Sequence, residues 1–305
     1  MASEHLSGGL SYEHAGMSRR AIAAYEAALQ AGTDPLDRAE AQMRIARAHF
    51  IDCDWESAVR EARIAVRLAE EAGSADLTAE AMNVEGGVYQ LRGEFDDADA
   101  IARAALNVAR SPRVRGILLQ NRGAIAAQRG DFTAASVFFR ESMDAFEQSG
   151  YEFGMATALN NAAAAARDAG DPEHSLRVAR QAADAARRLS AYETLSLAVQ
   201  NQAYALVALG RTGEAEAPLG EALGHHSATA NMLRQAECLE IMGILYTLKP
   251  DERDTAERCF DLARTLAERV DAGVLATRVV RRLAELRAEG EGTGDTTTDV
   301  ERPLP

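Results

Sequence analysis

Lysine is almost absent from this chain of 305 residues: Lys249 is the only one, and arginine supplies the other positive side chains. No Gly-Lys-Ser or Gly-Lys-Thr sequence occurs, which excludes a Walker-type phosphate-binding loop. The formal net charge is −14, and a strongly acidic chain is poorly suited to the phosphate backbone of nucleic acid. We therefore expect no nucleic-acid partner.

Cysteine is also scarce. Cys53, Cys238 and Cys259 are odd in number and lack Cys-x-x-Cys spacing, which argues against a disulfide framework or a zinc site. His225 and His226 are adjacent, have no third ligand at metal-binding spacing, and are expected in a solvated loop between repeats. The Gly-x-Ser-x-Gly and His-Glu-x-x-His motifs are missing too. These absences predict no catalytic residues, no metal ion and no cofactor.

Long apolar runs are absent as well. No stretch approaches the length of a membrane span, and the first residues show no basic segment followed by an apolar one. Alternating runs of β-branched residues are too few to suggest strands, and aromatic residues make up only 5% of the chain. Alanine, which has the highest helix propensity, is abundant. The composition predicts a helical protein in the cytoplasm with no membrane partner.

What the chain does contain is a repeat of 37 to 41 residues. Each repeat has a small residue, a short polar turn that begins seven residues later, and an alanine or serine five or six residues beyond that point. The small residues are Gly9, Ala46, Gly86, Gly123, Ala163, Ala203 and Gly243. The later positions are Ala21, Ala58, Ala98, Ala135, Ser175, Ala215 and Ala256. A period of this length is typical of a solenoid of helical hairpins.

Each repeat is predicted to form two helices joined by the turn. The seven hairpins are expected at about 5–35, 36–75, 76–112, 113–150, 151–190, 191–230 and 231–270. A last helix, about 273–289, carries an apolar face and is expected to cap the array; that face is Leu275, Val279, Leu283 and Leu286. From residue 290 the composition changes to Gly, Thr, Asp, Glu and Pro. The predicted domains are therefore a solenoid over 1–289 and a disordered acidic tail over 290–305.

The segment ALNNAAAAARDAGDPEHSLRVARQAADAAR resembles a tetratricopeptide repeat. It is similar to the longer repeats of kinesin light chains and of bacterial MalT-type regulators, and the likeness covers about residues 5–270. The resemblance implies an all-α, right-handed superhelical solenoid in which the first helix of each hairpin lines the concave surface. It also implies a protein that binds other proteins or peptides and has no enzymatic activity of its own.

A series of side-chain amides precedes the small residue in successive first helices: Asn83, Gln120, Asn121, Asn160, Asn161, Gln200 and Asn201. Carried over from the family by position, these side chains would lie along the concave groove, flanked by Arg167 and Asp168 and, in the second repeat, by Arg44 and Arg47. Each carboxamide offers donors and an acceptor, so a row of them can pair with the backbone of an extended peptide. The alternative is that asparagine at this position only packs adjacent helices.

Two functions are consistent with these observations. The first is a scaffold or adaptor that binds a partner's peptide or helix in the concave groove. The second is a sensory or regulatory protein that acts through a separate effector in transcription or signalling, because the chain has no room for a DNA-binding or ATPase domain. A clamp for a peptide carboxylate, as in chaperone-binding relatives, is disfavoured because it depends on lysines.

Overall fold

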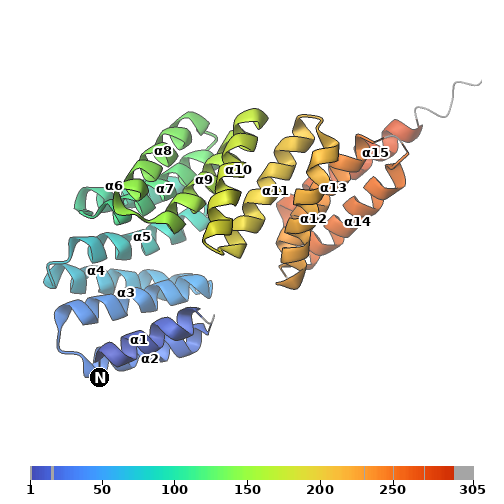
Figure 1. Ribbon diagram of the computed structural model, residues 1–305. Helices are drawn as coiled ribbons and strands as arrows, with labels where there is room; N and C mark the ends of the chain where they lie inside the picture. Colours follow the sequence, from blue (N-terminus) through green and yellow to red (C-terminus); the bar gives the residue numbers. More distant parts are fainter. Residues whose placement is uncertain (1, 15–16, 230, 250, 271, 292–305) are drawn as a thin grey trace, which may run out of the picture. The chain divides into compact units, whose positions relative to one another are not determined.

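The computed structural model describes residues 2–14, 17–229, 231–249, 251–270 and 272–291 (Figure 1). All regular secondary structure within these ranges is α-helix, and the helices fall into two compact units, Met1–Ala169 and Gly170–Pro305. The predicted tail lies outside the described residues from position 292 onward, and the last helix extends to Glu291. The predicted span of one solenoid domain, 1–289, stays a prediction.

The first unit contains nine helices in its described part. They are α1 (Ala2–His14), α2 (Ser18–Ala31), α3 (Pro35–Ile51), α4 (Trp55–Glu71), α5 (Ala75–Leu91), α6 (Phe95–Val108), α7 (Pro112–Gln128), α8 (Phe132–Ser149) and α9 (Glu152–Asp168). Each helix packs on the next, and α1, α3, α5, α7 and α9 also contact one another in succession. The even-numbered helices of the described chain make no such contacts among themselves. The first helices of the hairpins therefore form one continuous layer.

The second unit repeats this arrangement. Its described helices are α10 (Pro172–Arg188), α11 (Tyr192–Ala208), α12 (Thr212–Ala228), α13 (Met232–Thr247), α14 (Arg253–Arg269) and α15 (Gly273–Glu291). Here α11, α13 and α15 form the layer of first helices. In both units the structure is the helical-repeat solenoid that the period predicts.

The turns fall where the repeat places them. Gly130 has φ +79°, a left-handed conformation that glycine adopts without steric cost, and it ends α7. Asp131 then begins α8, because its side chain accepts a hydrogen bond from the backbone N–H of Ala134 at 2.9 Å. Where the repeat lacks glycine, Cys53 and Asp251 take the same left-handed conformation. The left-handed turn is therefore kept in repeats that have another residue in place of glycine.

Glycine in the first helix of several hairpins makes room for an aromatic side chain of the second helix. Gly123 lies against Phe139, which is 1% exposed: a Cβ added to Gly123 would come within 2.6 Å of that ring. A Cβ added to Gly9 or Gly243 would come even closer to the ring of Tyr25 or Phe260, respectively. In the second hairpin the same two positions hold Ala46 and Ala62, which share one buried cluster. In three of these four hairpins, glycine on the first helix contacts an aromatic ring on the second helix. In the fourth, both positions hold alanine.

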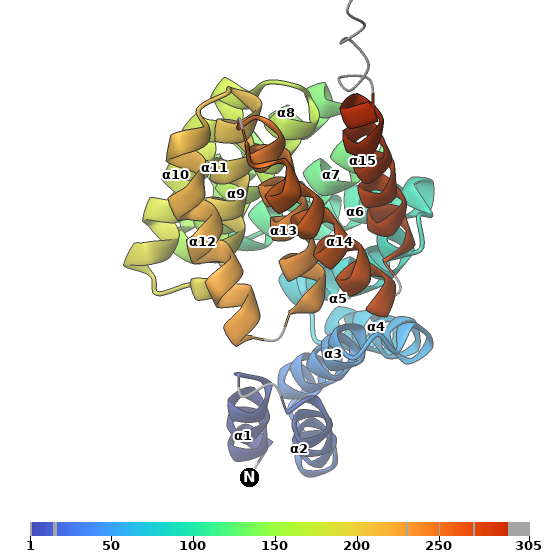
Figure 2. The same ribbon diagram turned by 90° about the vertical axis from the view of Figure 1, so that its right-hand side faces the viewer.

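The last helix caps the second unit, as its apolar face predicts. In α15, Leu275, Val279, Leu283 and Leu286 are all buried and pack in one cluster with Phe260 of α14 and Ala236 of α13. Figure 2 shows α15 lying beside α14 at the end of this unit. The helix therefore takes the place that the first helix of a further hairpin would occupy.

The adjacent histidines do not lie in a loop, so that expectation was wrong. Both belong to the last turn of α12, and His226 is only 2% exposed, with no hydrogen-bond partner for its Nε2 atom. Its backbone carbonyl accepts a hydrogen bond from Gln235 of α13 at 3.0 Å. Burial lowers the pKa of His226, and the nearby His225 and Arg234 lower it further.

We expect this histidine to make the protein less stable in mild acid. The unfolded chain binds a proton at His226 near the ordinary pKa of about 6.5, whereas the folded chain binds it only at lower pH. The free energy of unfolding should therefore fall as the pH drops below about 6.5. In His226→Leu that part of the fall should vanish, which urea unfolding between pH 7.5 and 5 measures. An unchanged pH dependence in the variant would refute the assignment.

Candidate functional site

A groove of about 470 Å³ lies within the first unit. Its lining comes mainly from the first-helix layer, α3, α5, α7 and α9, with Phe146 of α8 and the residue that begins the next hairpin, Tyr151. The volume is in the range of sites that hold small ligands or short peptide segments. We call this hollow the unit-1 groove.

Three of the predicted amides, Asn83, Gln120 and Asn121, line the unit-1 groove, and all three are partly exposed. Asn121 on α7 donates from Nδ2 to Oδ1 of Asn83 on α5 at 2.6 Å. This bond joins adjacent first helices, as the packing alternative requires. The other amide atoms of these residues make no hydrogen bond within the described chain, and all three residues line the hollow. They are available to a ligand.

Charged groups stand beside the amides. Glu80 lines the groove without a hydrogen bond or ion pair to any other described residue, and burial raises its pKa although Arg113, Arg44 and Arg47 act against this. The guanidinium of Arg113 lies over the ring of Tyr151, 5.1 Å from its centre. Arg47 is 3.5 Å from a carboxylate oxygen of Glu13. The groove therefore offers both signs of charge.

Its walls are apolar. Phe153 is 50% exposed and Leu91 58% exposed, and both line the groove. The Tyr151 ring packs at 5.4 Å from Phe146 and 6.4 Å from Phe153, measured between ring centres. Exposed apolar side chains beside polar groups in a hollow are typical of surfaces that bind another molecule.

The other predicted residues of the first unit lie outside this lining, apart from Arg47. Asn160 and Asn161 are on α9, where Asn160 is only 7% exposed. Arg167 donates from Nε to Oδ1 of Asp168 at 2.8 Å. Arg44 on α3 is held by Glu40 of its own helix and by Glu13. The contacts of the two arginines orient their side chains within the first-helix layer.

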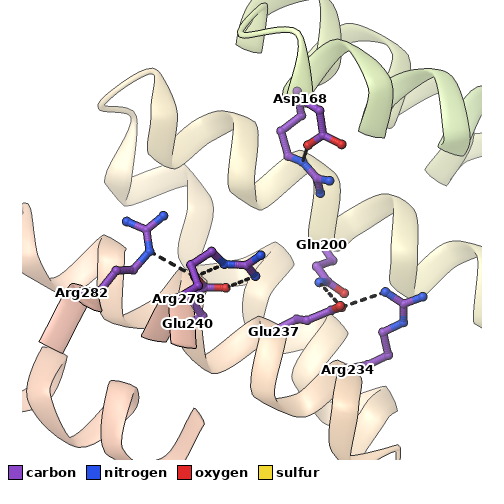
Figure 3. A network of polar contacts seen from close by, with 8 residues as sticks. Asp168, Gln200, Arg234, Glu237, Glu240, Arg278 and Arg282 are labelled. Carbon is purple, nitrogen blue, oxygen red and sulfur yellow. Dashed lines mark hydrogen bonds and ion pairs between the residues drawn. The ribbon is translucent and has the colours of Figure 1, made fainter. Parts of the chain in front are cut away.

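Gln200 and Asn201 belong to α11 of the second unit, where both are buried. Gln200 donates from Nε2 to Oε2 of Glu237 at 3.1 Å, and the same oxygen accepts a bond from Arg234 at 2.8 Å (Figure 3). The Oε1 atom of Gln200 has no partner in the described chain. The continuous row of amides through both units stays a prediction.

The sequence reasoning missed a buried ion cluster in the second unit. Glu240 on α13 is 4% exposed and accepts hydrogen bonds from Arg278 at 2.5 and 2.6 Å and from Arg282 at 3.1 Å (Figure 3). Glu240 stands forty residues after Gln200, at the same position of the repeat. That spacing was the available signal, because it extends the polar series of the first helices by one more repeat. In the structure this acid contacts two arginines of α15.

Histidine, cysteine and acidic side chains do not cluster as metal ligands in the described part of the chain. No group of three or more histidine, cysteine or acidic residues there is placed to hold a metal ion. Cys238 and Cys259 are buried free thiols, and burial raises the pKa of Cys238 to about 12. Among the described helices, none is long and apolar enough to cross a membrane.

The layered hairpins define a helical-repeat solenoid protein. No protein-family model and no curated protein sequence matches the chain. A Rap protein in complex with competence and sporulation factor aligns over 93% of this chain and 74% of its own, with 14% identity and a TM-score of 0.62. The apo form of RapI aligns over 95% of this chain and 99% of its own, also at 14% identity, with a TM-score of 0.63.

A third structure is a signal transduction ATPase with numerous domains and a tetratricopeptide repeat sensor, from Pyrococcus horikoshii. It aligns over 90% of this chain with 14% identity and a TM-score of 0.68, but this chain spans only 44% of that protein. At this identity the likeness concerns the fold. The chain has the tetratricopeptide-repeat fold.

Proposed function

We propose that this chain is a non-enzymatic interaction scaffold that binds a peptide segment of a partner protein in the unit-1 groove. The observation that carries the proposal is the joint presence of three amides and exposed apolar walls in one hollow. Amide groups can pair with a peptide backbone, and the walls can hold its side chains. The Rap protein complexed with competence and sporulation factor supports the general idea, since it has the same fold.

The Asn83–Asn121 bond adds to this proposal. It fixes the two carboxamides relative to each other, so that less side-chain entropy is lost when a ligand binds. The NH2 group of Asn83 and the second N–H and the carbonyl oxygen of Asn121 remain for a ligand, and Gln120 adds a third amide on α7. A short stretch of extended backbone presents the same alternation of donors and acceptors.

The second candidate is a sensory protein that acts through a separate effector. It is favoured by the likeness to a protein described as carrying a tetratricopeptide repeat sensor. The two functions share the groove and differ in the consequence of binding. A scaffold keeps a second partner attached whether the groove is filled or empty, whereas a sensor gains or loses its effector when the groove is filled.

Removing the exposed walls should abolish capture of the partner without unfolding the protein. In Leu91→Ala/Phe153→Ala, we expect recovery of partner proteins by affinity purification to be lost, since two contact residues that contribute about 1–2 kcal/mol each together lower the affinity roughly 30- to 900-fold. A second variant, Asn83→Ala/Gln120→Ala/Asn121→Ala, tests the amides by melting temperature and partner affinity. Lower affinity at unchanged melting temperature supports backbone binding, and the reverse pattern supports helix packing.

The matched control is Leu36→Ala/Ile51→Ala. These residues belong to the same unit, are 49% and 54% exposed, and lie outside the groove. The control should recover the same partners as the unaltered protein. Equal recovery by the wall variant and the control would refute binding in the unit-1 groove.

A further inference from the structure

A second hollow, of about 570 Å³, lies along α4 and the end of α5 and shares no lining residue with the unit-1 groove. Four arginines line it: Arg60, Arg63 and Arg67 of α4, and Arg92, which directly succeeds α5. Glu56 is the one acidic residue among its described lining. We call this hollow the arginine surface. It is a local concentration of positive charge on a chain with a net charge of −14.

Two of these guanidinium groups are held in place. Arg63 donates to Oε1 of Glu85 at 2.7 and 2.9 Å and to the Tyr89 hydroxyl at 3.3 Å. Arg60 donates to Glu61 at 2.9 Å and to Ser57 at 3.1 Å. Both arginines are still more than half exposed, at 60% for Arg60 and 56% for Arg63. Each guanidinium has five N–H donors, so donors remain for a ligand.

The other two guanidinium groups have no partner in the described chain. Arg67 and Arg92 are exposed and form neither a hydrogen bond nor an ion pair with a described residue. Trp55 and Tyr89 line the same hollow, and the Trp55 ring is set edge-on against Phe50 with 5.7 Å between ring centres. Preset arginines beside two aromatic rings, with two more arginines unpaired, make a surface that is complementary to an acidic ligand.

We infer that the arginine surface binds an acidic helical segment of a second partner protein through its carboxylates. Arg60, Arg63 and Arg67 are spaced by three and four residues, so they lie along one face of α4 over about 10 Å. An acidic helix with glutamates at the same spacing presents carboxylates at the same interval. A bidentate carboxylate matches the planar fork of each guanidinium. The protein would thereby join two partners through separate surfaces of one unit.

The chain contains its own reporter for this surface. Trp55 is the only tryptophan, so fluorescence excited at the indole reports directly on occupancy of the arginine surface. The probe is a synthetic helical peptide with glutamates spaced by three and four residues. We expect a saturable change in Trp55 fluorescence that weakens as sodium chloride is raised, because exposed ion pairs are screened by salt. The same peptide with glutamine in place of glutamate should give no saturable change.

The test variant is Arg67→Glu/Arg92→Glu, which reverses the two unpaired charges and touches no bond of the described chain. It should bind the acidic peptide at least about tenfold more weakly. Arg19→Glu/Arg140→Glu makes the same charge change at two exposed arginines of the same unit outside this hollow, and should bind within about twofold of the unaltered protein.

Equal weakening in the two variants would show that only net charge matters and would overturn the proposal. Absence of a saturable change with the acidic peptide would also overturn it. Tighter binding of a single-stranded oligonucleotide than of the peptide would assign the surface to phosphates instead of carboxylates. Because the two hollows share no residue, the wall variant Leu91→Ala/Phe153→Ala should bind the acidic peptide normally, which separates this proposal from the one for the unit-1 groove.

Discussion

Deleting residues 273–305 is expected to lower the melting temperature steeply, whereas deleting only 292–305 leaves it unchanged. The larger deletion removes Leu275, Val279, Leu283 and Leu286, which are at most 6% exposed. Burying one such side chain contributes about 1.5–3 kcal/mol, so the four together contribute roughly 6–12 kcal/mol as an upper limit. That is comparable with the whole stability of many domains, about 5–15 kcal/mol.

The larger deletion also leaves a buried acid without its partners. Glu240 would lose the hydrogen bonds from Arg278 and Arg282 and stand beside the newly uncovered apolar surface of α14. Thermal unfolding followed by far-ultraviolet circular dichroism, which monitors the loss of α-helix, measures the effect of both losses. Equal melting temperatures for the full chain and the two truncated forms would show that α15 contributes nothing as a cap.

The second large effect is expected at the contact between Gly123 and Phe139. Phe139→Ala should destabilise the protein by about 3–5 kcal/mol, because it leaves a cavity in a fully packed hairpin. Gly123→Ala places a Cβ within 2.6 Å of the Phe139 ring, and the resulting strain of about 1–3 kcal/mol exceeds or balances the gain of about 1 kcal/mol in helix propensity.

Combined, the two changes should partly cancel. The double variant Gly123→Ala/Phe139→Ala creates the alanine–alanine pairing that Ala46 and Ala62 already form in the second hairpin. We expect it to be more stable than Phe139→Ala alone by about 1 kcal/mol, since the clash is gone and the propensity gain remains. Urea unfolding of the four proteins in this cycle gives the coupling free energy. Strict additivity would contradict the pairing.

The repeat and the cap could be predicted from the sequence because they depend on local chemistry. A left-handed turn needs glycine or a tolerant substitute, and Gly130 and Gly210 indicate such turns directly. The apolar face of α15 has the helical period of about 3.6, so its burial could be expected from helix geometry alone. His226 was wrongly expected in a loop, because α12 continues through it to Ala228. Its contact with Gln235 belongs to α13, which comes later in the sequence.

The candidate site was predicted less completely. Placing Asn83, Gln120 and Asn121 on the first-helix layer required only the register of the repeat. The hydrogen bond between Asn121 and Asn83 depends on the rotamers of side chains on two different helices. No pattern in the sequence indicates those rotamers. The aromatic side chains of the groove were missed because Phe146 and Phe153 stand at different positions of the repeat. Their rings both contact Tyr151, which follows the turn at Gly150.

The fit between a first-helix glycine and the ring opposite it has an evolutionary consequence. In the Gly123–Phe139 contact and in the Gly9–Tyr25 contact, the two partners belong to the same hairpin. A gene duplication that copies a whole hairpin therefore copies both halves of the fit, and the new hairpin arrives with its own core already matched. Lengthening such an array by recombination requires compensating mutations only where neighbouring hairpins meet, and inherited mismatches should be concentrated there.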